Sequence, residues 1–276
     1  MLINCKPPIT NSLLWKIEKE GSLPSFLFGT IHVYDPEVFR IPEILYQLID
    51  SVDIYSPEAD NRNVSASEML SRFVVRNPPD YSLKNYFNDE NYANILNLSK
   101  IDADILDKCK PFFVASMVLN EEKMPVNSID SELLRYAASI GKPVYAMESV
   151  EEQIDAIDAI PFEEQAAIIT ESFMNLDAKN DFETIMNDYK EQNLRALEES
   201  LKKMNPTQLF TEFIQTKRNI VMSNKIDWVL SEGQSLFVAV GALHLPDTQN
   251  AKGVVSLLRE KGYSMQPVEF SFVTEF

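Results

Sequence analysis

The chain has 276 residues, of which 42 are Asp or Glu and 25 are Lys or Arg, so its formal net charge is −17 at pH 7. Basic surface binds a phosphate backbone and an anionic membrane repels acidic surface. The charge therefore argues against nucleic-acid and membrane-surface binding and favours cationic partners such as a metal ion. A hydrophobic fraction of 45% and a charged fraction of 24% are typical of a globular protein.

The N-terminal part predicts strands around one helix. The alternating segment 12–21 stops at a glycine, and the apolar run 22–33 follows after a turn, which is typical of a hairpin leading into a buried strand. Apolar residues at helical spacing predict a helix over 42–52. Residues 53–60 then predict a short strand that ends in acidic residues.

The middle of the chain predicts helices, because apolar residues recur with periods near 3.6 from about residue 64 to 232. We expect one helix to end at Gly141, and a strand-like run over 142–148 interrupts the series. Ser149 and Glu152 have the spacing of a capping box, which predicts the start of the next helix.

The segment 209–233 predicts a long amphipathic helix that ends at a glycine. The C-terminal part then returns to the pattern of the N-terminal part, with a predicted strand over 235–245, a helix and a final strand or pair of strands.

The order of these elements predicts a single α/β domain over residues 1–276. Its sheet is expected to be mixed, mainly parallel and built from both chain ends, with the helical segment of about 64–232 inserted as a cap. The longest apolar stretch is about half of a membrane-spanning length, and the N-terminus lacks the apolar core of a secretory signal. We therefore expect a soluble protein, cytoplasmic by default, with no membrane segment.

The chain has two histidines, His32 and His244, and each ends a Gly-x-x-His sequence after an apolar run. Strands that are apolar on both faces are typical of the centre of a sheet, and ligands bind at the C-terminal edge of such strands. If the two strands are neighbours, the imidazoles converge at that edge. A single histidine after a strand is usually structural, but the repeated pattern favours a shared function.

Two neutral imidazoles are natural ligands for a divalent metal, and a carboxylate would complete the set. Glu58 and Glu148 each end a strand-like run, so each is expected at the same sheet edge. There a carboxylate can ligate a metal ion or act as general base on its bound water. The sequence does not separate these roles, and the alternative for either glutamate is a solvated side chain.

Arg218 and Asn219 lie on the long helix that precedes the second histidine strand. Arg218 is a candidate to hold a substrate carboxylate or to stabilise an oxyanion, and the alternative is a surface arginine. Asn219 is a candidate to position the backbone or the substrate. Asp130 is interpreted as a helix N-cap in preference to a partner of the site.

Several other catalytic arrangements are absent from the sequence, including the nucleophile elbow, the P-loop, the dinucleotide fingerprint and His-Glu-x-x-His. Cys5 and Cys109 have no metal-site or redox spacing and are interpreted as free thiols.

With these residues assembled, the chain resembles the TraB/GumN family, which is related to the TIKI metalloproteases. The resemblance runs through nearly the whole chain and includes the blocks "LLWKIE…FLFGTIHV", "IDSELLRYAASIGKPVYAMESVEEQIDAI", "KRNIVMSNKI" and "VAVGALHLPDTQNAKGVVSLLREKGYSMQPV". The C-terminal block is the most specific, because Gly-x-x-His-Leu-Pro and Leu-Leu-Arg-x-x-Gly-Tyr occur in it together.

The resemblance implies an α/β fold shared with haem-binding ChaN-like and erythromycin-esterase-like proteins. It also implies dependence on manganese or cobalt, with zinc also compatible, and peptide hydrolysis as in the TIKI members. Carried over by motif, it points to His32, His244, Glu58 and Arg218 and to Glu148, which follows a methionine where relatives usually have leucine. The connection "DTQNAKG" after His-Leu-Pro is longer than in many relatives, and it is expected to border the site.

The leading hypothesis is a metal-dependent hydrolase, with peptidase as its expected activity on a peptide or small-molecule substrate. His32, His244 and Glu58 would hold the ion, Glu58 or Glu148 would move the proton, and Arg218 would stabilise the developing anion. The alternative is a non-catalytic protein that binds haem, a metal ion or a signalling peptide on the same fold. The acidic charge adds a preference for cationic peptides.

Overall fold

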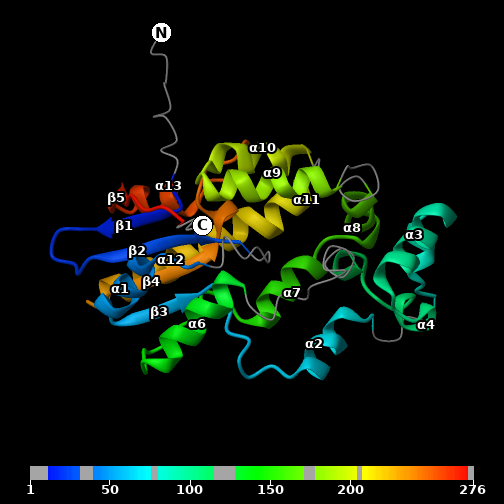
Figure 1. The fold of residues 1–276 in the computed structure, drawn as a ribbon, viewed down its shortest axis with the longest axis horizontal. Coiled ribbons are helices and arrows are strands. Elements are labelled where there is room, and N and C mark those ends of the chain that lie inside the picture. The colour runs from blue at the N-terminus through cyan, green and yellow to red at the C-terminus, as the bar shows by residue number, and fades with distance from the viewer. Residues whose placement is uncertain are drawn as a thin grey trace, which may run out of the picture.

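The fold centres on a mixed five-stranded sheet in the order β3-β4-β2-β1-β5 within the part of the chain that the structure describes (Figure 1). The structure is a computed structural model, and it describes residues 12–31, 40–75, 80–114, 128–170, 178–203 and 207–272. The strands are β1 (Leu14–Glu18), β2 (Ser25–Thr30), β3 (Ile54–Pro57), β4 (Leu236–Gly241) and β5 (Ser264–Pro267). The α/β fold and the mixed sheet predicted from the sequence are confirmed.

The two strands of the histidine motifs are neighbours in this sheet. β2 and β4 pair in parallel, from Phe26 opposite Phe237 to Thr30 opposite Gly241. β3 continues the parallel part on the other side of β4, whereas β1 pairs antiparallel with β2 and with β5. Both ends of the chain therefore build one sheet, and its parallel strands end at a common edge.

The helices fall into two groups along the chain. The first follows β2 and β3 and comprises α1 (Glu43–Ser51), α2 (Ala66–Phe73), η1 (Leu83–Tyr86), α3 (Asp89–Ser99), α4 (Ala103–Leu106), α6 (Ile129–Ser139), α7 (Val150–Asp158) and α8 (Phe162–Ile169). The second comprises α9 (Ala178–Lys190), α10 (Leu194–Lys203), α11 (Gln208–Phe210), η3 (Thr211–Thr216), α12 (Lys217–Ser231), η4 (Ala242–His244) and α13 (Val254–Glu260). The helices α3 and α4 lie at the end of the molecule remote from the sheet (Figure 1).

The predicted helix boundaries are largely confirmed by local chemistry. Ser149 caps α7 through the predicted capping box with Glu152. Gly141, just after α6, has φ +71°, the left-handed conformation in which a helix can end without a Cβ clash. The interpretation of Asp130 as a cap is wrong, because Ser128 is the N-cap of α6 and Asp130 lies in its first turn. The Ser128 hydroxyl accepts the Ser131 N–H and so fills the position assigned to Asp130.

Two predicted elements differ from the structure. The run 142–148 lies along the free edge of β3 and joins it through isolated bridges, Tyr55 with Val144 and Ala59 with Glu148, instead of forming a strand. Pro57 of β3 has no N–H to donate, which interrupts the ladder between those bridges. The long helix predicted over 209–233 contains a π-helical segment, η3, immediately before α12.

The main hydrophobic core packs around the sheet and includes Leu27, Phe28, Tyr55, Phe237 and Val238, all fully buried. A smaller core around Leu83, Ile95 and Leu106 supports the lobe formed by η1, α3 and α4. Cys109 belongs to it as a buried free thiol, and Cys5 lies outside the described residues. Among the helices that the structure describes, none is long and apolar enough to cross a membrane.

Candidate functional site

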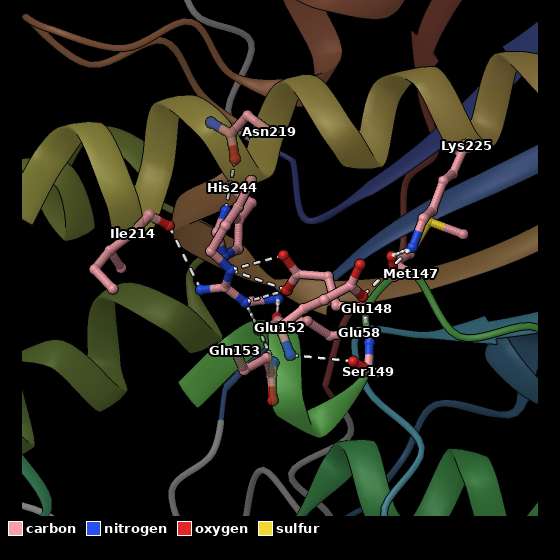
Figure 2. Close-up of polar contacts among 12 residues, drawn as sticks. Glu58, Met147, Glu148, Ser149, Glu152, Gln153, Ile214, Asn219, Lys225 and His244 are labelled. Carbon is pink, nitrogen blue, oxygen red and sulfur yellow. Dashed lines mark hydrogen bonds and ion pairs between the residues drawn. The ribbon is translucent and has the colours of Figure 1, made fainter. Parts of the chain in front are cut away.

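The candidate site lies where the parallel strands β3 and β4 end. Glu58 directly follows β3, His244 ends the short helix η4 after β4, and Glu148 comes from the run beside β3. Figure 2 shows Glu58 and Glu148 with their polar partners, and the His244 ring borders the Cβ position of Gly241 together with Glu58. Glu58, Glu148 and His244 are all buried, with exposed fractions of 7%, 4% and 7%.

Arg218 joins the two glutamates. Its Nε donates to Oε1 and Oε2 of Glu148 at 3.0 and 2.9 Å, and its Nη2 donates to Glu148 Oε2 at 2.6 Å and to Glu58 Oε1 at 2.5 Å. Nη1 lies 3.5 Å from the carbonyl oxygen of Ile214, in the π-helical segment η3. One guanidinium therefore holds two buried carboxylates, and most of its N–H groups are engaged by them.

Burial and charge act against each other in this cluster. Burial disfavours the charged carboxylate and raises the pKa of Glu148, and the neighbouring Glu58 raises it too, although Arg218 acts to lower it. Burial by itself would lower the pKa of Arg218, but the two glutamates outweigh that effect, so its pKa is raised. The arginine therefore stays charged, and Glu148 is the carboxyl whose affinity for a proton is increased.

His244 is oriented by a chain of two hydrogen bonds. The amide Nδ2 of Asn219 donates to the backbone carbonyl of Lys252 at 2.8 Å, which turns its Oδ1 toward the imidazole. His244 Nδ1 lies 2.6 Å from that oxygen and must donate, so the neutral tautomer that fits this contact has its hydrogen on Nδ1 and leaves Nε2 as the acceptor. Asn219 is 1% exposed, so water does not compete for this contact.

The loop 247–253 after the second histidine contains Lys252, whose backbone carbonyl accepts the hydrogen bond from Asn219. The backbone of Gly253 packs so closely there that a Cβ would lie 2.2 Å from the carbonyl oxygen of Leu245. The N–H of Gly253 donates to Asp247 Oδ1 at 2.9 Å, which closes the loop. The loop that follows the second histidine therefore helps to orient Asn219.

Gly241 brings Glu58 and His244 together. Its N–H donates to Glu58 Oε2 at 2.7 Å. A Cβ on Gly241 would lie 3.3 Å from Glu58 Oε2 and 3.5 Å from His244 Cδ2, so the space that a side chain would occupy is bordered by both groups. The carboxylate of Glu58 and the imidazole of His244 thus border the position where Gly241 has no side chain, and we call this position the cradle of Gly241.

Two further residues of the site were missed by the sequence reasoning. Gln153 on α7 donates its Nε2 to Glu58 Oε1 at 2.9 Å. Lys225 on α12 donates to the carbonyl of Met147 at 2.6 Å and lies 3.7 Å from Glu152, which fixes the run that carries Glu148 (Figure 2). The capping box at the start of α7 placed that helix, but no pattern in the sequence pointed to Gln153.

The structure brings together five of the six predicted site residues, in two hydrogen-bonded groups that meet at Gly241. One group joins Glu58, Glu148 and Arg218, and the other joins His244 and Asn219. The sixth, His32, lies outside the described residues. Within the described ranges, no three His, Cys, Asp or Glu side chains are grouped closely enough to hold a metal ion.

The chain is thus an α/β protein with a mixed sheet, and polar residues gather at the C-terminal ends of its central parallel strands, the edge at which open α/β sheets generally bind ligands. Residues 13–267 match the TraB/PrgY/gumN family, and the chain belongs to that family. No curated protein and no solved structure matches the chain significantly.

Proposed function

We propose that this protein is a divalent-metal-dependent hydrolase that cleaves amide bonds in peptides. The observation that carries the proposal is the meeting of Glu58 Oε2 and the His244 ring over Gly241 at the end of β4. An imidazole nitrogen and a carboxylate oxygen are ligands that suit zinc, manganese and cobalt.

The chemistry of these residues fits a metal ion. Asn219 accepts the Nδ1 hydrogen of His244, and such partners orient most metal-ligating histidines in proteins. Gly241 leaves space beside both donor groups that a Cβ would fill. In the proposal His244 and Glu58 hold the ion together with His32. When bound, such an ion polarises a carbonyl group and lowers the pKa of a bound water.

The two carboxylates take different roles in this proposal. Glu58 is fixed by the N–H of Gly241, by Gln153 and by Arg218, so it suits a ligand that must not move. Glu148 takes up the proton, because burial raises its pKa toward the range in which a general base works. The proton would sit on Oε1, which accepts one hydrogen bond from Arg218, whereas Oε2 accepts two.

Arg218 acts in this proposal mainly through the glutamates that it holds. Its Nε and Nη2 are directed at Glu148 and Glu58, so a direct contact with a developing anion would have to come from Nη1. The oxyanion role predicted for Arg218 remains a prediction and needs that nitrogen.

The test combines metal titration with a peptidase assay. The chain is stripped with EDTA and titrated with Mn²⁺, Co²⁺ and Zn²⁺ by calorimetry, and cleavage of a mixture of cationic and acidic peptides is then followed. His244→Asn keeps a polar group facing Asn219 but lacks Nε2, and His244→Gln places an amide near the Nε2 position. We expect loss of metal affinity in both, loss in Glu58→Gln, and retained affinity without cleavage in Glu148→Gln. Metal affinity unchanged in the His244 and Glu58 variants would overturn the proposal.

A second candidate is a non-catalytic protein that binds haem, a metal ion or a signalling peptide. The pairing of both carboxylates with one guanidinium favours it, because an ion-paired carboxylate is a poorer base. Haem titration followed by absorbance near the Soret region tests the haem form. Recovery of a bound peptide uncleaved would favour sequestration over hydrolysis.

A further inference from the structure

Thr30 is a buried hydroxyl next to the site that the roles above do not use. It follows the glycine of the first Gly-x-x-His sequence and ends β2. Its residue is 1% exposed, and Oγ1 has no hydrogen-bond partner within the described residues. A buried polar group without a partner destabilises the folded state, so a position that keeps one calls for an explanation.

The sheet register places Thr30 beside the cradle of Gly241. The two residues face each other across β2 and β4, and side chains at paired positions lie on the same face of a sheet. On that face, the Cβ position of Gly241 is bordered by Glu58 Oε2 and the His244 ring. Thr30 therefore flanks the same space from the side of β2.

The residue before Thr30 shows that the two faces differ at this point. A Cβ on Gly29 would point to the opposite face and lie 3.0 Å from the Cα of Ala242 and 3.1 Å from Leu245 Cδ2. That face is packed by apolar groups. On the face of Thr30, the carboxylate of Glu58 and the imidazole of His244 border the Cβ position of Gly241, and the paired Thr30 lies beside it.

We propose that the Thr30 hydroxyl donates a hydrogen bond to the oxygen of a substrate carbonyl bound between Glu58 and His244. The inference rests on the proposed function and adds a substrate-contacting residue to it. A donor of this kind is most effective when the carbonyl oxygen gains negative charge, and removing one such donor lowers the rate about 10²-fold or more. Among the described residues the hydroxyl has no hydrogen-bond partner, and in this proposal the bound substrate supplies one.

The matched control is Ser56, a second buried hydroxyl without a partner among the described residues. Ser56 is 0% exposed and lies on β3 opposite Val238. Val238 and Gly241 are three residues apart on one strand, so Ser56 points to the face opposite that of Thr30. Ser56→Ala removes an equally buried hydroxyl without touching the cradle.

The experiment compares Thr30→Val, Thr30→Ser and Ser56→Ala in the full chain with Mn²⁺. Valine keeps the shape and strand preference of threonine, so Thr30→Val is expected to keep its Tm to within about 2 °C or to raise it. We expect its kcat/KM for peptide cleavage to fall about 10²-fold, Thr30→Ser to recover most of the loss, and Ser56→Ala to retain wild-type activity.

The outcomes separate this inference from the proposed function. A wild-type protein that cleaves peptides, with a Thr30→Val variant equally active, would overturn the role of Thr30 alone. A Tm of Thr30→Val lowered by more than about 5 °C would show a structural partner for the hydroxyl and would also overturn it. A wild-type protein without cleavage would overturn the proposed function, and this inference with it.

Discussion

Replacing Arg218 by methionine is the strongest single perturbation that the site offers. Methionine keeps much of the length of the side chain but removes the cation from between Glu58 and Glu148. The side chains of Arg218, Glu58 and Glu148 are only 12%, 9% and 4% exposed, so solvent cannot take over the stabilising role of the guanidinium. Removing one partner of a buried ion pair destabilises a protein by about 3–5 kcal/mol, because the remaining charge is left uncompensated.

The loss is large enough to measure by urea or thermal unfolding. At about 2–4 °C per kcal/mol for a chain of this size, Arg218→Met should lower Tm by roughly 10 °C at pH 7.5. Arg62→Met is the matched control, since Arg62 binds Asp60 with two hydrogen bonds of 2.8 and 2.6 Å but is 40% exposed. An exposed pair contributes about 0–1 kcal/mol, so the control should move Tm by little.

Two further measurements identify the cause of the loss. The triple variant Glu58→Gln, Arg218→Met, Glu148→Gln removes the charges together and should recover much of the stability. The penalty of Arg218→Met should also shrink as the pH falls from 7.5 toward 5, because the unpaired carboxyls then take up protons. A penalty equal to that of Arg62→Met, or one independent of pH, would refute the reasoning.

The direction in which the stability of the wild-type protein changes with pH follows from the raised pKa of Glu148. Its pKa in the folded state is raised by burial, so the folded protein binds this proton more tightly than the unfolded chain does. The stabilisation is present in full below the unfolded pKa and is lost as the pH rises through the folded pKa. Because Arg218 acts to lower the pKa of Glu148, it limits this loss of stability at high pH, and Arg218→Met should enlarge the loss.

Three other predictions concern residues around the two glutamates and His244. Asn219→Ala should shift neutral His244 from the Nδ1–H tautomer toward a mixture, which ¹⁵N NMR of the imidazoles can read in a chain with two histidines; an unchanged tautomer would contradict the role of Asn219. Gly253→Ala should lower the yield of folded protein strongly, because its Cβ would lie 2.2–2.4 Å from backbone atoms of Leu245 and Pro246. Gly241→Ala should fold but lose metal affinity by calorimetry. A well-folded Gly253→Ala variant together with a misfolded Gly241→Ala variant would refute this. Gln153→Glu should destabilise the chain above pH 6 by placing a second carboxylate against Glu58, and equal urea midpoints for this variant and wild type would rule that out.

The sequence predicted the parts of the site that depend on strand ends. Runs that are apolar on both faces and end in Gly-x-x-His predicted two central strands, and β2 and β4 are neighbours as expected. Glu58 and Glu148 were selected from 42 acidic residues because each ends a strand-like run, and the Glu148 N–H does donate to the Glu58 carbonyl at the edge of the sheet. Position along a strand is a property of the local sequence, so it can be read without a structure.

The sequence could not predict which side chains of the helices meet those strand ends. Arg218 carries the same local pattern as a surface arginine, and its pairing with two glutamates depends on how α12 packs against the sheet. Gln153 lies one turn inside a helix whose start was predicted, yet its contact with Glu58 depends on the direction in which α7 leaves the edge. Packing angles between elements are set by the whole core, so these contacts appear only in the structure.

The ion-paired cluster links the stability of this protein to the chemistry proposed for it. Arg218 holds the Glu58 carboxylate in place beside His244, and the same guanidinium compensates the buried charge of Glu148. A variant that frees Glu148 to act as a stronger base would also leave a buried carboxylate without its partner, so activity and stability cannot be improved separately at this position. Thr30 at the same edge has a hydroxyl without a partner among the described residues, so removing that polar group should keep or raise the stability of the fold while it impairs the proposed site.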